Sequence, residues 1–141
     1  MIKTKSSSVN ISNLNQNLLN FIEDMSNMFN GIVITSGNDS IHSLNSRHYI
    51  NKAIDVGAFS SEKQAYASFK KYVKENDKLL KDKYGIEDII DEVTHIHIEM
   101  PLTDVETKEI FKKNVNYSVI GGLLIGITAY IYYLMKKFKK I

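Results

Sequence analysis

Four histidines and one aspartate fall in two short clusters that lie about forty residues apart in the chain. The first cluster contains His42, His48 and Asp55, and the second contains His95 and His97. Two imidazoles and one carboxylate bind zinc and leave a fourth position open to water, as in catalytic rather than structural zinc sites. Thiolate ligands are excluded, because the chain has no cysteine. The spacing therefore predicts a mononuclear Zn²⁺ site.

The second cluster has the pattern of a half-buried strand. Ile96 and Ile98 alternate with His95 and His97, and residues two apart on a strand share a face. The two histidines should therefore point the same way while the two isoleucines enter the core. A single histidine on a polar strand face is most often a solvated bystander, but here every histidine of the chain lies in one of the two clusters. This grouping favours a shared metal ion.

At these residues the chain resembles a known family. Ser46-x-His48, with Ala53 and Asp55 following and a His-x-His strand later, resembles the zinc peptidases of bacterial cell walls. That superfamily includes D-Ala-D-Ala carboxypeptidases and dipeptidases, and phage endolysins that cut L-Ala-D-Glu bonds. The Hedgehog amino-terminal domain shares its fold and zinc site. The stretch 34–39, which precedes His42, is similar to the phage members and to Hedgehog, and the resemblance covers roughly residues 31–100.

The resemblance implies a role for each residue of the two clusters. His48, Asp55 and His97 would be the zinc ligands. His42 and His95 would lie beside the metal, where His95 could donate to a developing oxyanion or orient a ligand. The family usually has glycine three residues after its first ligand histidine, a position held here by Asn51. Asparagine tolerates a left-handed backbone, so the turn is expected to survive.

The general base should be an acid just before the histidine pair, where Asp91 and Glu92 both stand. Positions 91, 93, 95 and 97 share one face of an uninterrupted strand, which favours Asp91. Glu92 would need a β-bulge to turn inward, and bulges are common beside active sites. Both residues remain candidates.

The remaining patterns predict an α+β fold in which helices pack on a small antiparallel sheet that carries the metal on its exposed face. Leu14, Leu18, Ile22, Met25 and Phe29 recur at helical spacing after a cap at Ser12 or Asn13. Ser61 and Gln64 match a capping box that opens a helix to about Lys83, with a stop at Gly85. The expected strands are 31–35, 53–56 and 88–100, the last ended by Pro101.

The carboxyl-terminal part is of a different kind. No charge occurs from Val115 to Met135, a length sufficient to cross a bilayer, and tyrosines and lysines flank the stretch. Gly122 and Gly126 form a small-xxx-small pattern that weakly favours a helix–helix dimer. Lysines lie on both sides, so the pattern leaves open on which side of the membrane the domain lies. The expected organisation is a flexible arm (1–11), a zinc peptidase-like domain (12–103), a linker (104–114), a transmembrane helix (115–135) and a basic tail (136–141).

Together with the uncharged stretch 115–135, the family resemblance implies a membrane-anchored, phage-like zinc metallopeptidase that hydrolyses an amide bond in the peptidoglycan stem peptide. The alternative is a non-catalytic zinc module of the same fold with a structural or virion role. A third reading is a small lysis accessory whose activity lies in the membrane helix. A net charge of +2 without a basic stripe argues against nucleic acid as a partner. The pattern does not distinguish D-Ala-D-Ala from L-Ala-D-Glu as the bond that is cut.

Overall fold

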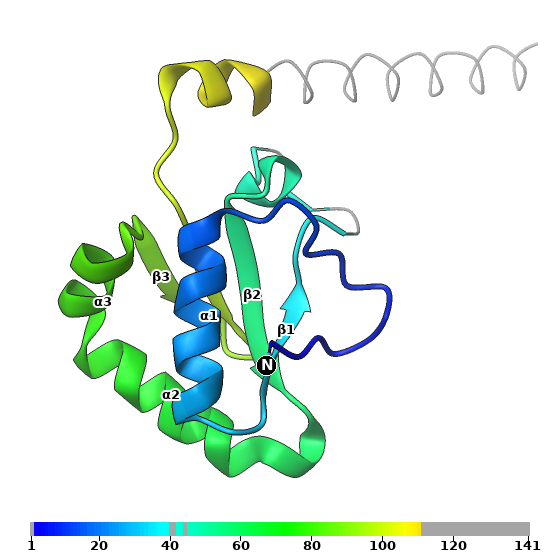
Figure 1. The fold of residues 1–141 in the computed structure, drawn as a ribbon, viewed down its shortest axis with the longest axis vertical. Helices are drawn as coiled ribbons and strands as arrows, with labels where there is room; N and C mark the ends of the chain where they lie inside the picture. Colours follow the sequence, from blue (N-terminus) through cyan, green and yellow to red (C-terminus); the bar gives the residue numbers. More distant parts are fainter. Residues whose placement is uncertain (1, 40–41, 44, 111–141) are drawn as a thin grey trace, which may run out of the picture.

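The computed structural model describes residues 2–39, 42–43 and 45–110. Its centre is a four-stranded antiparallel sheet with the strand order β1-β2-β4-β3. Three helices pack against this sheet, which confirms the expected α+β class (Figure 1). The elements in chain order are α1 (Gln16–Met28), β1 (Ile32–Ser36), η1 (Arg47–Ile50), β2 (Ala53–Ala58), η2 (Ser60–Glu62), α2 (Lys63–Glu75), α3 (Asp77–Tyr84), β3 (Asp88–Asp91) and β4 (Ile96–Glu99).

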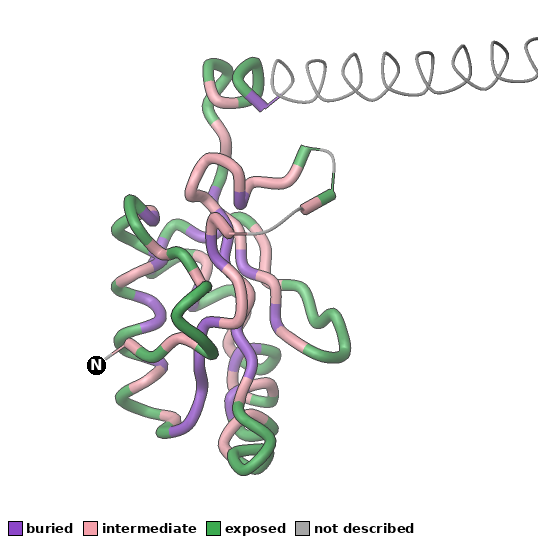
Figure 2. Tube along the Cα trace, turned by 90° about the vertical axis from the view of Figure 1, so that its right-hand side faces the viewer, coloured by how far each residue is buried: buried purple, intermediate pink, exposed green. Residues whose placement is uncertain are grey.

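The core lies between the helices and one face of the sheet. Alternating residues of β2 and β4 point into it, so Ile54 pairs with Ile98 and Val56 pairs with Ile96. Phe21 of α1 and Phe69 of α2 are fully buried against this face. Buried positions alternate with partly exposed ones along β4, whereas β1 begins with three consecutive buried residues. Buried stretches run through the middle of the domain (Figure 2). The opposite face of β2 and β4 is left free to carry polar side chains.

Several helix boundaries differ from the expectation. The cap of α1 is Asn15, whose side chain accepts from the Asn17 amide, whereas Asn13 has a left-handed backbone (φ 61°). The predicted capping box of the second helix is wrong, because residues 60–62 form a 3₁₀ turn and no side chain caps α2. This helix also breaks at Asn76, which gives α2 and α3 in place of one helix. The helix stop predicted at Gly85 is confirmed, and this glycine has a left-handed backbone.

The prediction of one continuous strand over residues 88–100, carrying the candidate metal ligands, is wrong. Residues 88–100 form a hairpin of β3 and β4 and not one continuous strand. The amide of Glu92 donates to the carbonyl of His95 at 3.0 Å and closes the turn. Val93 has a left-handed backbone within this turn (φ 66°), a conformation that is unfavourable for a β-branched residue. Asp91 therefore does not share a face with His97, contrary to the prediction, because the chain reverses between them and Asp91 pairs with Ile96.

Both ends of the described domain form regular hydrogen-bonded structure, the first beside the sheet and the second as a helix. The amino-terminal residues, expected to form a flexible arm, lie against the edge of the sheet, where Thr4 bridges Ile34 in parallel. Residues 104–110, expected to begin a linker, are helical. Thr103 and Glu106 form the capping box of this helix, with the Thr103 amide donating to the Glu106 carboxylate at 2.8 Å.

Among the described residues, no helix has the length and apolar character needed to span a membrane. The predicted span, residues 115–135, lies outside this part of the chain, as do Gly122 and Gly126 and the basic tail.

Candidate metal centre

His48 is held at the centre of the site by main-chain contacts. Ser46 caps the short helix η1, and its hydroxyl accepts from the His48 amide at 3.3 Å. Asn51 ends η1 with a left-handed backbone (φ 61°), which is the conformation expected at this position. The imidazole is buried, and its Nδ1 lies 2.6 Å from the carbonyl oxygen of Gly37. A carbonyl can only accept, so Nδ1 carries a proton, and in the neutral imidazole Nε2 then presents a lone pair.

Asp55 and His97 are neighbours on adjacent strands and on the same face of the sheet. They are register partners on β2 and β4, on the face opposite the helices. The Asp55 Oδ1 lies 2.9 Å from His97 Nδ1 and 3.3 Å from His48 Nε2. The sheet therefore fixes two of the three predicted ligands, and η1 supplies the third.

These three side chains form a group that could hold a metal ion. The His48 Nε2 and His97 Nδ1 atoms are 3.4 Å apart, which completes a triangle with edges of 2.9, 3.3 and 3.4 Å. Tetrahedral ligands at about 2.0–2.1 Å from a zinc ion are separated by about 3.3–3.4 Å. The two edges that end on His48 match this separation, while the edge between Asp55 and His97 is shorter and would have to lengthen to admit the ion. Because the His48 Nε2 lone pair faces a carboxylate oxygen, the contact is repulsive unless a cation or a proton lies between them.

Electrostatics in the group favour opposite charges on its members. Burial raises the pKa of Asp55, but hydrogen bonds with His48 and His97 outweigh it and lower that pKa well below its usual range. Burial lowers the pKa of His97, yet the hydrogen bonds with Asp55 and Glu99 outweigh it and raise that pKa. Asp55 is thus ionised near neutral pH and supplies the negative charge that a cation needs.

His42 supports His48 and does not join the ligand triangle. Their rings stack with centroids 4.0 Å apart and planes within 2°. The His42 Nε2 lies 2.6 Å from the carbonyl oxygen of Asp39. Burial, together with the nearby His48, lowers the pKa of His42 and favours its neutral form. A neutral ring packed on a ligand is consistent with the predicted place beside the metal.

His95 lies beside Asp55, and Glu92 lies beside His95. His95 Nε2 is 3.0 Å from the Glu92 carboxylate and 3.5 Å from Asp55 Oδ1. Both side chains line the same open cavity of about 440 Å³ as the three candidate ligands. The turn that was not predicted places them there, because it brings Glu92 back beside His95.

Asp91 lies away from this cavity. It pairs with Ile96 in the hairpin register and so belongs to the helical face of the sheet. Its carboxylate accepts a hydrogen bond from Lys70 of α2 at 2.6 Å, and this bond lowers the pKa of Asp91. Of the two acids proposed as the base, only Glu92 is brought to the site.

Three supporting groups were not identified from the sequence. The Gly37 carbonyl orients His48, and no residue type signals it. Glu99 lies 3.3 Å from His97 Nε2, and Arg47 lies 3.4 Å from Glu99 and so ties it to η1. The strand alternation of His95, His97 and Glu99 could have indicated that Glu99 shares their face. Such partners fix the orientation of a ligand histidine.

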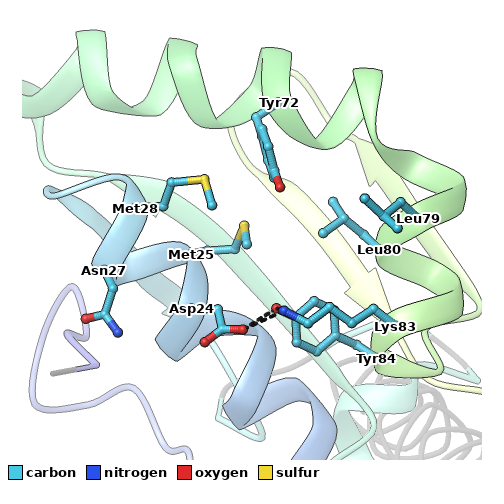
Figure 3. Close-up of a pocket in the computed structure, with 9 residues that line it drawn as sticks. All are labelled: Asp24, Met25, Asn27, Met28, Tyr72, Leu79, Leu80, Lys83 and Tyr84. Atoms are coloured by element: carbon cyan, nitrogen blue, oxygen red, sulfur yellow. Dashed lines mark hydrogen bonds and ion pairs between the residues drawn. The ribbon is translucent and has the colours of Figure 1, made fainter.

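A second groove, of about 510 Å³, lies between α1 and the α2–α3 pair. Apolar side chains such as Met25 and Leu80 line it, and Asp24, Lys83 and Tyr84 join at one end (Figure 3). The residues that line this groove include no histidine and none of the three candidate metal ligands.

The chain matches no family model, and no curated protein or solved structure is significantly similar to it.

Proposed function

We propose that the chain is a zinc-dependent peptidase that hydrolyses an amide bond in the peptidoglycan stem peptide. The observation that carries this proposal is the triangle of His48, Asp55 and His97 in an open cavity, with an acid and a further histidine beside it. A closed structural site would use all its positions for protein ligands, whereas three ligands in an open cavity leave room for substrate. The motif resemblance to the cell-wall peptidases supplies the substrate class.

Zinc is the proposed ion, because two neutral imidazoles and a carboxylate are a frequent zinc ligand set. When bound, zinc supplies Lewis-acid activation of a carbonyl group and of water. The tautomers also fit if the ion replaces the proton between His97 Nδ1 and Asp55: His48 would offer Nε2 while Gly37 holds its Nδ1 proton, and His97 would offer Nδ1 while Glu99 accepts from its Nε2. Each imidazole thus has one nitrogen for the ion and one fixed by the protein.

Glu92 is the proposed general base. It lines the cavity, and its carboxylate lies within hydrogen-bond distance of His95. In hydrolysis Glu92 would take a proton from the attacking water and pass it to the leaving amine. His95 would donate a hydrogen bond to the oxygen of the scissile carbonyl as negative charge develops there. Asp91 has no part in the reaction, since Lys70 holds it on the helical face.

Glu92→Gln and Asp91→Asn form a matched pair that tests this assignment. In the full chain, Glu92→Gln should retain zinc but reduce hydrolysis of purified peptidoglycan by about 10²–10⁴-fold, the usual contribution of a general base. Asp91→Asn should retain both zinc and activity. Released amines measure hydrolysis, and elemental analysis measures zinc. Activity in both variants equal to the parent would refute the mechanism, and a parent that cuts no peptidoglycan would favour the non-catalytic zinc module.

Attachment to a bilayer is the second part of the proposal. Residues 115–135 carry no charge and are long enough to cross about 30 Å of hydrocarbon. The full chain should sediment with membranes and resist extraction by high salt or alkaline carbonate. Release by salt would contradict a spanning anchor, because surface attraction between lysines and lipids is screened within about 10 Å at 0.1 M salt.

A further inference from the structure

The amino-terminal arm, residues 2–11, is bonded to the segment that supports His48. Near its start, the Lys5 amide donates to the Ile34 carbonyl at 2.9 Å, and the Ile34 amide donates to the Lys3 carbonyl at 2.9 Å. Near its end, the Asn38 amide donates to the Asn10 carbonyl at 2.8 Å. The Asn10 amide donates in turn to the Asp39 carboxylate at 3.2 Å. The arm thus pairs with β1 at the edge of the sheet and then continues along residues 37–39.

The contact between arm and segment is close. A Cβ atom added to Gly37 would lie 2.1 Å from the carbonyl oxygen of Asn10 and 3.4 Å from Ile11 Cγ2. No side chain fits in that space without displacing main-chain atoms. Val9 and Ile11 also pack against the hydrophobic core, so apolar burial as well as hydrogen bonding holds the arm in place.

The segment 37–39 orients both histidines of the first cluster through main-chain oxygens. The Gly37 carbonyl lies 2.6 Å from His48 Nδ1, and the Asp39 carbonyl lies 2.6 Å from His42 Nε2. Inside the segment, the Gly37 amide donates to the Asp39 carboxylate at 2.6 Å. The same carboxylate therefore joins the arm to the turn that presents both carbonyls. A displacement of Asn10 would move the group that fixes the His48 tautomer.

We infer that the amino-terminal arm is a positioning element of the metal centre and sets its affinity for zinc, although none of its described residues (2–11) is hydrogen-bonded to a candidate ligand. This inference rests on the proposed zinc site. Partners that orient a ligand histidine typically contribute 10–100-fold in metal affinity. Deleting residues 2–11 should therefore weaken zinc binding by about that factor.

The test is a double-mutant cycle in the otherwise full chain, with zinc affinity measured by chelator competition at a temperature where every variant is folded. Gly37→Ala should weaken binding when the arm is present, because its Cβ collides with Asn10. In the chain without residues 2–11, Gly37→Ala should have little additional effect, because the colliding atom is gone. A structural role unrelated to His48 would give additive effects.

A readout without metal separates this inference from the zinc proposal. In the metal-free protein, NMR of ¹⁵N-labelled histidine should show a hydrogen-bonded Nδ1 proton on His48, and this signal should be lost on deletion of the arm. Equal affinity with and without the arm, or an unchanged His48 signal, would overturn the inference while leaving the zinc site intact. An intact chain that binds no zinc would overturn the proposed function itself. If the deletion variant does not fold, Gly37→Ala in the intact chain decides: unchanged affinity overturns the inference.

Discussion

Neutralising Glu99 should weaken zinc binding, although Glu99 is not a proposed ligand. Its carboxylate lies 3.3 Å from His97 Nε2, while Arg47 Nη2 lies 3.4 Å away on its other side. With Glu99 as acceptor, the proton of His97 stays on Nε2 and leaves Nδ1 free for the ion. Loss of such a partner typically costs 10–100-fold in affinity. The contact here is long and the Glu99 side chain is 20% exposed, so we expect the lower end, about tenfold or about 1.4 kcal/mol.

Glu87 provides the matched control. It also pairs with Arg47, but it makes no contact with His97. Glu99→Gln and Glu87→Gln therefore remove the same charge from the same arginine, and only the first changes the environment of the ligand. Chelator competition at neutral pH should give about a tenfold loss for Glu99→Gln and at least that for Glu99→Ala, with less than a twofold change for Glu87→Gln. If Glu99→Gln and Glu87→Gln weakened zinc binding equally, the loss of a carboxylate partner of Arg47, and not the orientation of His97, would control the affinity.

Two further predictions concern the frame around the site. Asn51→Ala should lower the free energy of unfolding by about 1–2 kcal/mol more than Asn51→Gly. Both variants lose the hydrogen bond from the Asn38 side chain, but only alanine is strained at φ 61°. Equal losses of the two variants in urea titrations would contradict this. Hydrogen bonding to Lys52 lowers the pKa of Glu106 from 4.5 to about 2. Its stabilising effect is therefore fully present above pH 4.5 and is lost as the pH falls through about 2. The stability difference between the parent and Glu106→Gln should shrink over that range, and a difference independent of pH would refute the assignment.

The parts of the site predicted from the sequence are those governed by short-range periodicity. Alternation around Ile96 and Ile98 identified the face that carries His97, and the observed register places Asp55 opposite it. The left-handed backbone of Asn51 was expected because the family resemblance implies glycine at this position and asparagine also tolerates that conformation. Both expectations concern residues within a few positions of the feature.

The features that escaped prediction depend on tertiary contacts. The turn between β3 and β4 contains no glycine, proline or asparagine, and it places Val93 in a conformation that valine disfavours, so no local signal marks it. Because this turn was not predicted, Asp91 was expected on the face of the sheet that carries His97, whereas it lies on the helical face. The support of His48 by Gly37 depends on a main-chain oxygen, which no residue type reveals. The docking of the amino-terminal arm depends on Ile34, about thirty residues away.

Metal content tests the central claim most directly. Purified full-length protein, folded and never exposed to a chelator, should contain about one zinc ion per chain by elemental analysis at near-neutral pH. His48→Ala, Asp55→Ala and His97→Ala should each remove it, because each deletes one corner of the ligand triangle. A folded parent without metal, or a full complement of zinc in all three variants, would contradict the assignment of these residues as a metal centre.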